Sequence, residues 1–70
     1  MALIITTGGR PTDALVERAR AVASACGVPF VERRKRSLAR LRADHEADLV
    51  YIVGHDKERL DDGERSLFVH

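Results

Sequence analysis

The stretch Leu49-Val50-Tyr51-Ile52-Val53-Gly54 decides the fold, because five apolar residues stand together and a glycine ends the run. A short continuous apolar run rich in β-branched residues is typical of a central strand covered on both faces, as in parallel sheets. Residues 2–6 form a second run of this kind, which stops before Gly8-Gly9. The sequence therefore predicts two buried strands.

Two helices are expected between these strands. The first begins at Thr12 or Asp13 and ends at Gly27, the usual left-handed stop. Its apolar stripe follows helical spacing and consists of Leu15, Ala19, Val22 and Ala23. Cys26, on its last turn, is interpreted as a small buried hydrophobe. The second, shorter helix has Ser37 as its N-cap and ends near Ala47.

The remaining segments complete the predicted sheet. Residues 29–32 form a short strand, with proline tolerated at its first position. Residues 57–61 and 65–70 flank Asp62-Gly63, a dipeptide that favours a type I′ hairpin turn. The order β-α-β-α-β plus a C-terminal β-hairpin predicts the α/β class, with a small mixed sheet and a parallel core. Right-handed crossovers place the strand at 2–6 between those at 29–32 and 49–53.

Length and composition indicate a single small domain over residues 1–70. One cysteine excludes an internal disulfide and a cysteine-based metal cluster, and it fits a reduced, cytoplasmic compartment. The three histidines stand far apart without a cysteine pair, so no metal site is predicted. No apolar run approaches the roughly 20 residues of a membrane span, so no membrane partner is expected.

Charge is segregated along the chain although the formal net charge is only +1. Residues 33–42 carry six basic side chains and no acid, centred on Arg33-Arg34-Lys35-Arg36-Ser37. Residues 43–70 carry eight acids and three basic side chains. Because a local field attracts a polyanion whatever the net charge, this basic stretch is the best candidate for a binding site.

Three loops are expected to meet at one edge of the sheet, because loops that follow parallel strands emerge on the same side, where α/β proteins bind ligands. They cover residues 6–12, 32–37 and 54–57, and two of them lead into helix N-termini, which suit phosphate. Arginine adds planar, two-pronged contacts to phosphate oxygens. The residues predicted to bind phosphate or nucleic acid are Arg10, Arg33, Arg34, Lys35, Arg36, Ser37 and Arg40. His55 is a further candidate for a loop contact, although a turn residue is its commoner role.

Other interpretations of these features stay open. A basic run is often only a solvated face, and it also fits a nuclear-localisation patch. Gly8-Gly9 lacks the Gly-Lys-Ser/Thr ending of a P-loop and is interpreted as a backbone turn. The aromatic residues Phe30, Tyr51 and Phe68 lie in predicted strands, where a core position is the default. No catalytic triad or nucleotide fingerprint is present, so whether the chain belongs to an enzyme stays open.

A family resemblance adds to this picture. The succession Thr6-Thr7…Arg10-Pro11, Arg33-Arg34-Lys35-Arg36-Ser37, Val53-Gly54…Glu58-Arg59-Leu60 and Leu67-Phe68-Val69-His70 resembles the N-terminal domain of predicted bacterial class I S-adenosylmethionine (SAM)-dependent methyltransferases. These are relatives of the small-subunit rRNA guanine-N2 methyltransferases. Thr7-Gly8-Gly9 departs from the bulkier residues expected before Arg-Pro.

The resemblance implies that residues 1–70 are the N-terminal fragment of a longer transferase. Its catalytic domain and SAM site would lie beyond His70, so this chain itself would bind no cofactor and carry no catalytic residue. It also implies that the chain helps to position RNA, with rRNA as the expected partner.

Three functions are therefore considered. The first is an RNA-recognition domain of a SAM-dependent RNA methyltransferase. The second is a structural or oligomerisation module that docks another domain, or a second copy of the chain, through its sheet edge. The third is a small enzyme acting on phosphorylated metabolites through the Gly8-Gly9-Arg10 loop and His55.

Overall fold

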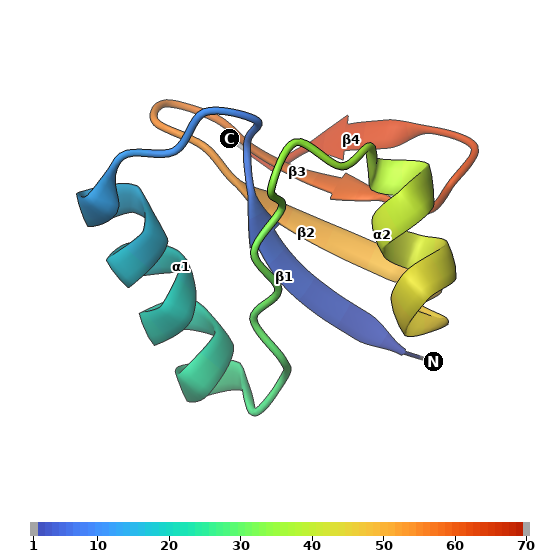
Figure 1. The fold of residues 1–70 in the computed structure, drawn as a ribbon, viewed down its shortest axis with the longest axis horizontal. Helices are drawn as coiled ribbons and strands as arrows, with labels where there is room; N and C mark the ends of the chain where they lie inside the picture. Colours follow the sequence, from blue (N-terminus) through green and yellow to red (C-terminus); the bar gives the residue numbers. More distant parts are fainter. Residues whose placement is uncertain (1, 70) are drawn as a thin grey trace.

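A four-stranded mixed sheet forms the centre of the chain in the computed structural model, which describes residues 2–69 (Figure 1). The elements are β1 (Leu3–Thr7), α1 (Asp13–Cys26), α2 (Leu38–His45), β2 (Leu49–Val53), β3 (Glu58–Asp61) and β4 (Ser66–Phe68). β1 and β2 pair in parallel, with Leu3 opposite Leu49, and β3 and β4 extend the sheet antiparallel. The predicted α/β class with a parallel core is confirmed.

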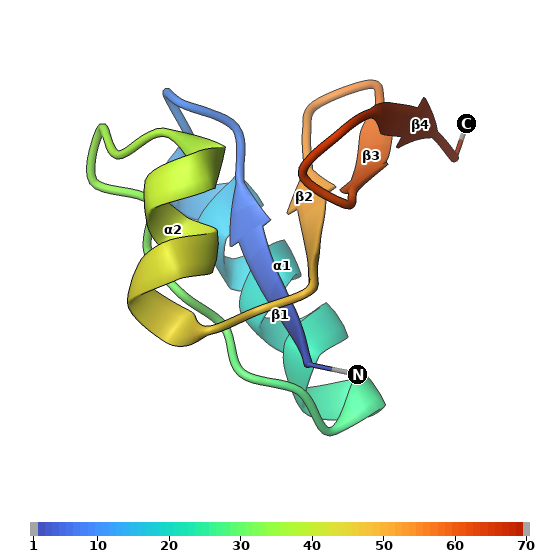
Figure 2. The ribbon, with the colours of Figure 1, turned by 90° about the vertical axis from the view of Figure 1, so that its right-hand side faces the viewer.

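The two helices cover opposite faces of β1 and β2, because successive residues of a strand point to opposite sides. One buried cluster packs beneath α2 and consists of Ile4, Val31, Leu41, Val50 and Ile52. The other packs beneath α1 and consists of Ile5, Leu15, Ala19, Ala23 and Val53. Figure 2 shows the β3–β4 hairpin projecting away from both helices. The helices therefore flank β1 at one edge of the sheet, and the β3–β4 hairpin forms the other edge.

Local capping sets the helix boundaries as predicted. The hydroxyl oxygen of Thr12 accepts a hydrogen bond from the Leu15 N–H at 3.2 Å, and Gly27 ends α1 at φ 69°. The Ser37 hydroxyl accepts from the Arg40 N–H at 3.1 Å and starts α2. Neither helix within residues 2–69 is long and apolar enough to cross a membrane.

The prediction that Cys26 is buried is wrong, because its thiol is exposed. The buried residues of α1 end at Ala23, and the helix ends at Gly27, directly after the cysteine. Helical spacing alone does not show where the sheet beneath a helix stops.

The predicted strand at residues 29–32 is reduced to a single parallel bridge between Phe30 and Ile5. The Ile5 N–H donates to the Pro29 carbonyl at 3.0 Å, and the Val31 N–H donates to the Ile5 carbonyl at 2.9 Å. Pro29 has no N–H to donate, and the Val31 carbonyl accepts from the Thr6 hydroxyl at 2.7 Å instead of continuing a ladder. The segment nevertheless lies beside β1 on the side away from β2, as expected.

The prediction of a type I′ turn at Asp62-Gly63 is also wrong. A loop of residues 62–65 joins β3 to β4, closed by a 3.1 Å hydrogen bond from the Asp62 N–H to the Arg65 carbonyl, and only Gly63 has a positive φ, 97°. The Asp62 carboxylate accepts from the N–H groups of Glu64 and Arg65, each at 2.9 Å, which favours the longer loop. The final residue of the predicted hairpin, His70, lies outside the described residues.

Candidate nucleic-acid interface

Residues 33–36, here called the basic turn, form a type I′ turn of four consecutive cationic residues. The Arg36 N–H donates to the Arg33 carbonyl at 2.9 Å, and the two central residues have positive φ, 47° for Arg34 and 65° for Lys35. A left-handed conformation costs a non-glycine residue about 1–2 kcal/mol. Backbone strain of this kind is concentrated at functional sites, which makes the turn a candidate site.

The two outer arginines of the basic turn hold its shape. Nε of Arg33 donates to the Arg36 carbonyl at 2.9 Å, and Nε of Arg36 donates to the Arg33 carbonyl at 3.2 Å. Arg36 also donates to the Glu32 carbonyl at 2.7 Å and pairs with Asp44 at 3.2 Å. Arg36, predicted as a phosphate ligand, is thus already engaged in structural contacts, whereas Arg34 and Lys35 are exposed at the tip.

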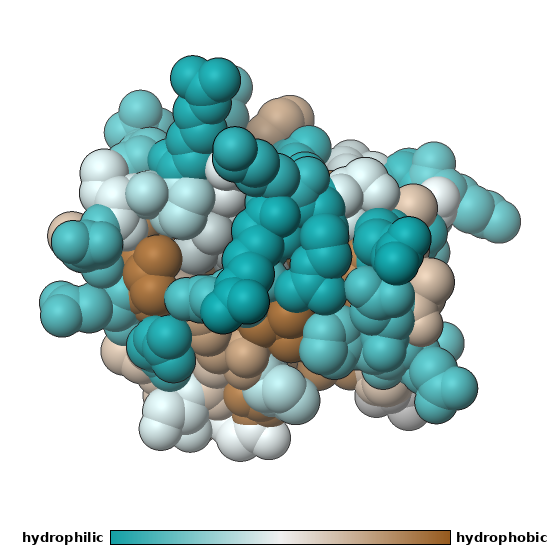
Figure 3. Space-filling view, viewed as in Figure 1, coloured by the Kyte–Doolittle hydropathy of each residue, from teal (hydrophilic) through white to brown (hydrophobic). Residues whose placement is uncertain are grey.

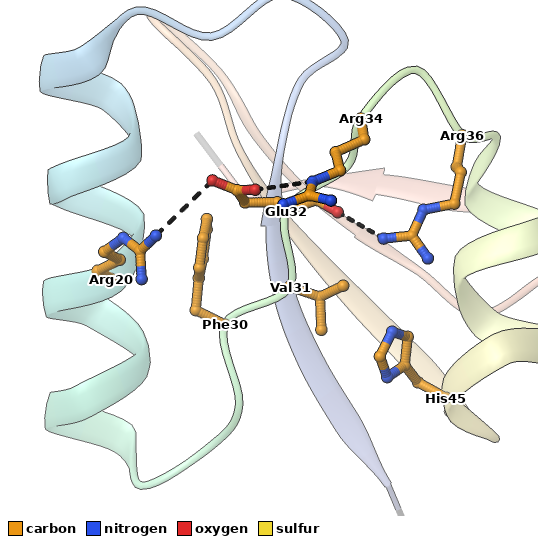
Figure 4. Close-up of a pocket in the computed structure, with 7 residues that line it drawn as sticks. All are labelled: Arg20, Phe30, Val31, Glu32, Arg34, Arg36 and His45. Carbon is orange, nitrogen blue, oxygen red and sulfur yellow. Dashed lines mark hydrogen bonds and ion pairs between the residues drawn. The ribbon is translucent and has the colours of Figure 1, made fainter.

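A groove of about 480 Å³, here called the larger groove, lies between α1 and α2 over residues 30–32 (Figure 4). Figure 3, which has the same view as Figure 1, shows long hydrophilic side chains crossing the middle of the molecule, with apolar surface visible between them. The residues that line the larger groove are Arg20, Phe30, Val31, Glu32, Arg34, Arg36 and His45.

Glu32 is the only acid that lines the larger groove among the described residues, and it pairs with two cations. Its carboxylate accepts from Nε of Arg34 at 3.0 Å and lies 3.7 Å from a guanidinium nitrogen of Arg20. Arg20 also lies over the Phe30 ring, 4.8 Å from the ring centre. The sequence did not single out Arg20 or His45 for this site, because each belongs to a helix and only packing brings it to the groove.

A second hollow of about 250 Å³, here called the smaller groove, lies between the loop after β1 and the basic turn. Thr7, Gly9 and Pro11 line one side, and Arg33, Arg34 and Lys35 line the other. The two predicted loops therefore meet. No residue of the third predicted loop, 54–57, lines either groove, and the 3.2 Å hydrogen bond from the Gly8 N–H goes to the carbonyl of Val53, the last residue of β2. His55 is exposed and lines neither groove.

The other predicted ligands lie close to this edge but differ in their freedom to bind. Arg10 and Lys35 are exposed, and neither has an ion-pair partner within residues 2–69. Arg40 is exposed and pairs with Asp44 at 3.2 Å. The Ser37 hydroxyl is engaged as the cap of α2, so any contact of this segment with a phosphate would come from the N–H groups at the N-terminus of α2.

A separate polar cluster lies beneath α1, away from the basic turn. The buried Glu58 carboxylate pairs with Arg18 and accepts a hydrogen bond from the Tyr51 hydroxyl. This hydrogen bond, and then burial, raise the pKa of Tyr51 above its ordinary value of 10.0. The cluster joins α1 to β3 and has a structural role. No group of three histidine, cysteine, aspartate or glutamate side chains within residues 2–69 is placed to hold a metal ion.

Comparison with known proteins gave no match to a family model, a curated protein or a solved structure. The fold and the site define a small α/β domain with two adjoining, cation-lined grooves.

Proposed function

We propose that this chain is an RNA-recognition domain that holds RNA phosphates at the basic turn and in the adjoining grooves. The observation that carries the proposal is the strained type I′ turn, which presents Arg34 and Lys35 to solvent at positive φ. Asparagine and glycine would be more stable at these two positions, so the presence of two long cations there supports a partner of opposite charge.

The shape of the site favours a chain-like polyanion over a small metabolite. The larger and smaller grooves share Phe30, Glu32 and Arg34 as lining residues, so one extended ligand can occupy both while it passes Arg34. Arg20 and Arg36 line the larger groove, and Arg33 and Lys35 line the smaller one. Cations on both sides of a shared position match the repeated phosphates of a nucleic acid. His55, on which a phosphometabolite enzyme would depend, lines neither groove.

The family resemblance supplies the proposed context. In this proposal the chain precedes the catalytic domain of a bacterial SAM-dependent rRNA methyltransferase, which would bind SAM and act on the base. The chain's own contribution is to hold the RNA backbone, which requires no catalytic group.

The test is the salt dependence of binding to a short single-stranded RNA, followed by fluorescence anisotropy. The variant Arg34→Ala/Lys35→Ala removes the two exposed cations of the turn without touching the contacts that Arg33 and Arg36 make. Its slope of log affinity against log salt should be shallower by about 1.4, since each phosphate contact on a single strand contributes about 0.7.

The matched control is Arg59→Ala/Arg65→Ala, which removes the same charge from the hairpin at the opposite edge of the sheet. This control should keep the wild-type slope. The same slope in wild type and Arg34→Ala/Lys35→Ala, or an equal change in both double variants, would overturn the proposal.

A second candidate function rests on β4. β4 and the residue that follows it expose large apolar side chains, at 56% for Leu67, 63% for Phe68 and 48% for Val69. β4 ends the sheet order among the described strands, and an edge strand can pair antiparallel with its own copy about a two-fold axis. Sedimentation over a wide concentration range tests this self-association, and a monomer throughout would exclude it.

A further inference from the structure

We infer that the larger groove takes one unpaired nucleobase, stacked on the ring of Phe30, with Glu32 accepting hydrogen bonds from the edge of that base. This inference rests on the proposed function and specifies it, since it makes the partner single-stranded RNA and gives it a base preference.

The position of Phe30 is the first observation. Phe30 is only half-buried and lines both grooves, although it also packs against the core beneath α1. Figure 4 shows its ring standing upright in the larger groove, with Arg20 on the α1 side and the open part of the groove, with Val31 and His45, on the other. Because Phe30 lines the groove and is not fully buried, it offers a base aromatic surface on which to stack.

The charges around the ring are the second observation. The Arg20 guanidinium lies 4.8 Å from the ring centre and covers the side of the ring toward α1. Arg34 and Arg36 line the same groove nearer the basic turn, so a base against Phe30 would have its flanking phosphates within the field of these arginines. An aromatic ring with adjacent arginines is the usual arrangement for holding single-stranded nucleic acid.

Glu32 provides the third observation, because it places a carboxylate in the middle of this cationic groove. A carboxylate accepts hydrogen bonds only, so it favours a base edge that carries an amino group, as in cytosine, adenine and guanine. Uracil has no amino group, and its single N3–H donor stands between two carbonyl oxygens, which a carboxylate repels. We therefore expect weaker binding of an RNA whose inserted base is uracil.

The direct test uses the wild-type chain and short RNAs that carry a single 2-aminopurine, whose fluorescence is quenched when it stacks. Binding to the single strand should change this fluorescence, and the duplex of the same sequence should bind more weakly and without the change. A fluorescence that stays constant when the RNA is fully bound would overturn the inference. This test uses only the wild-type chain, so it does not depend on whether a variant folds.

The variant test compares Phe30→Leu with Phe68→Leu, the same change at an exposed phenylalanine of the opposite edge. Phe30→Leu should weaken single-strand binding about tenfold, because a stacked base contributes on that scale, and should abolish the 2-aminopurine signal. Phe68→Leu should leave both unchanged, and Phe30→Tyr should restore them.

The outcomes separate this inference from the proposed function. If RNA binds with the salt slope expected for the basic turn, while Phe30→Leu affects single strand and duplex equally, the stacking inference fails and the recognition function stands. If the wild-type chain binds neither single-stranded nor duplex RNA, the proposed function fails and the inference fails with it.

Discussion

Nε of Arg34 donates a 3.0 Å hydrogen bond to the carboxylate of Glu32, two residues earlier in the chain. The side chain of Arg34 is 78% exposed and that of Glu32 is 45% exposed, so water already screens the pair. Pairs of this kind contribute about 0–1 kcal/mol to stability. The Glu32 carboxylate therefore lies where an external anion would bind Arg34, and it contributes little to stability there. A phosphate can take its place.

Replacing Glu32 by glutamine should strengthen RNA binding by about three- to tenfold at low salt, because it removes the anion that competes for Arg20 and Arg34. The gain should be largest for RNA whose inserted base is uracil, so discrimination against uracil should decrease. Anisotropy titrations with RNAs that differ at one base measure both effects. Glu64→Gln makes the same charge change in the hairpin loop, and an equal gain there would assign the effect to net charge alone.

The variant Arg34→Asn/Lys35→Gly should raise the free energy of unfolding by about 1 kcal/mol, because asparagine and glycine adopt the left-handed conformations of a type I′ turn more readily. RNA binding should weaken at the same time, since both exposed cations are lost. Urea unfolding provides the measurement. Arg34→Ala/Lys35→Ala removes the same charges while keeping side chains at positive φ, and a similar gain in that variant would refute the strain argument.

Tyr51→Phe should lower the free energy of unfolding by about 1–2 kcal/mol near neutral pH, because the buried Glu58 carboxylate loses a hydrogen-bond donor. The folded state raises the pKa of Tyr51 above 10.0, so the contribution of Tyr51 is complete below that pH and is lost as the pH rises through the folded pKa. Urea unfolding from neutral to alkaline pH should show the wild-type advantage shrinking, whereas a difference that stays constant or grows would contradict this account.

Asp62→Ala should destabilise the hairpin, because the carboxylate no longer accepts from the N–H groups of Arg65 and Glu64. These two hydrogen bonds lower the pKa of Asp62 below 3.8, so its stabilisation is present above that pH and is lost as the pH falls through the folded pKa. The stability difference between wild type and Asp62→Ala should therefore shrink in acid, toward the difference between Asp62→Asn and Asp62→Ala. Asp62→Asn keeps the acceptor without the charge and should lie between the two.

Local patterns were sufficient for most of the fold. The apolar runs that became β1 and β2 were read directly, since a buried strand needs little beyond β-branched side chains and a terminating glycine. Thr12 and Ser37 cap the helices as predicted because capping involves only neighbouring residues. The predicted turn at Asp62-Gly63 failed because of hydrogen bonds to the next residues, whereas the predicted strand at 29–32 failed because of a distant partner. The Thr6 hydroxyl takes the carbonyl of Val31 across 25 residues of sequence, and no pattern within residues 29–32 reports that competition.

For the candidate site, the sequence by itself determined where the positive charge lies and that it follows a segment beside β1. The tertiary structure alone decided which cations are engaged and which are available. Arg20 pairs with Glu32 and covers Phe30 only because α1 packs beside residues 30–32, and Arg36 turns inward to the carbonyls of Glu32 and Arg33. The physical reason is the distance along the chain: caps and strand propensities arise between neighbouring residues, whereas a groove, its aromatic lining and its ion pairs arise between segments that meet only after the chain has folded.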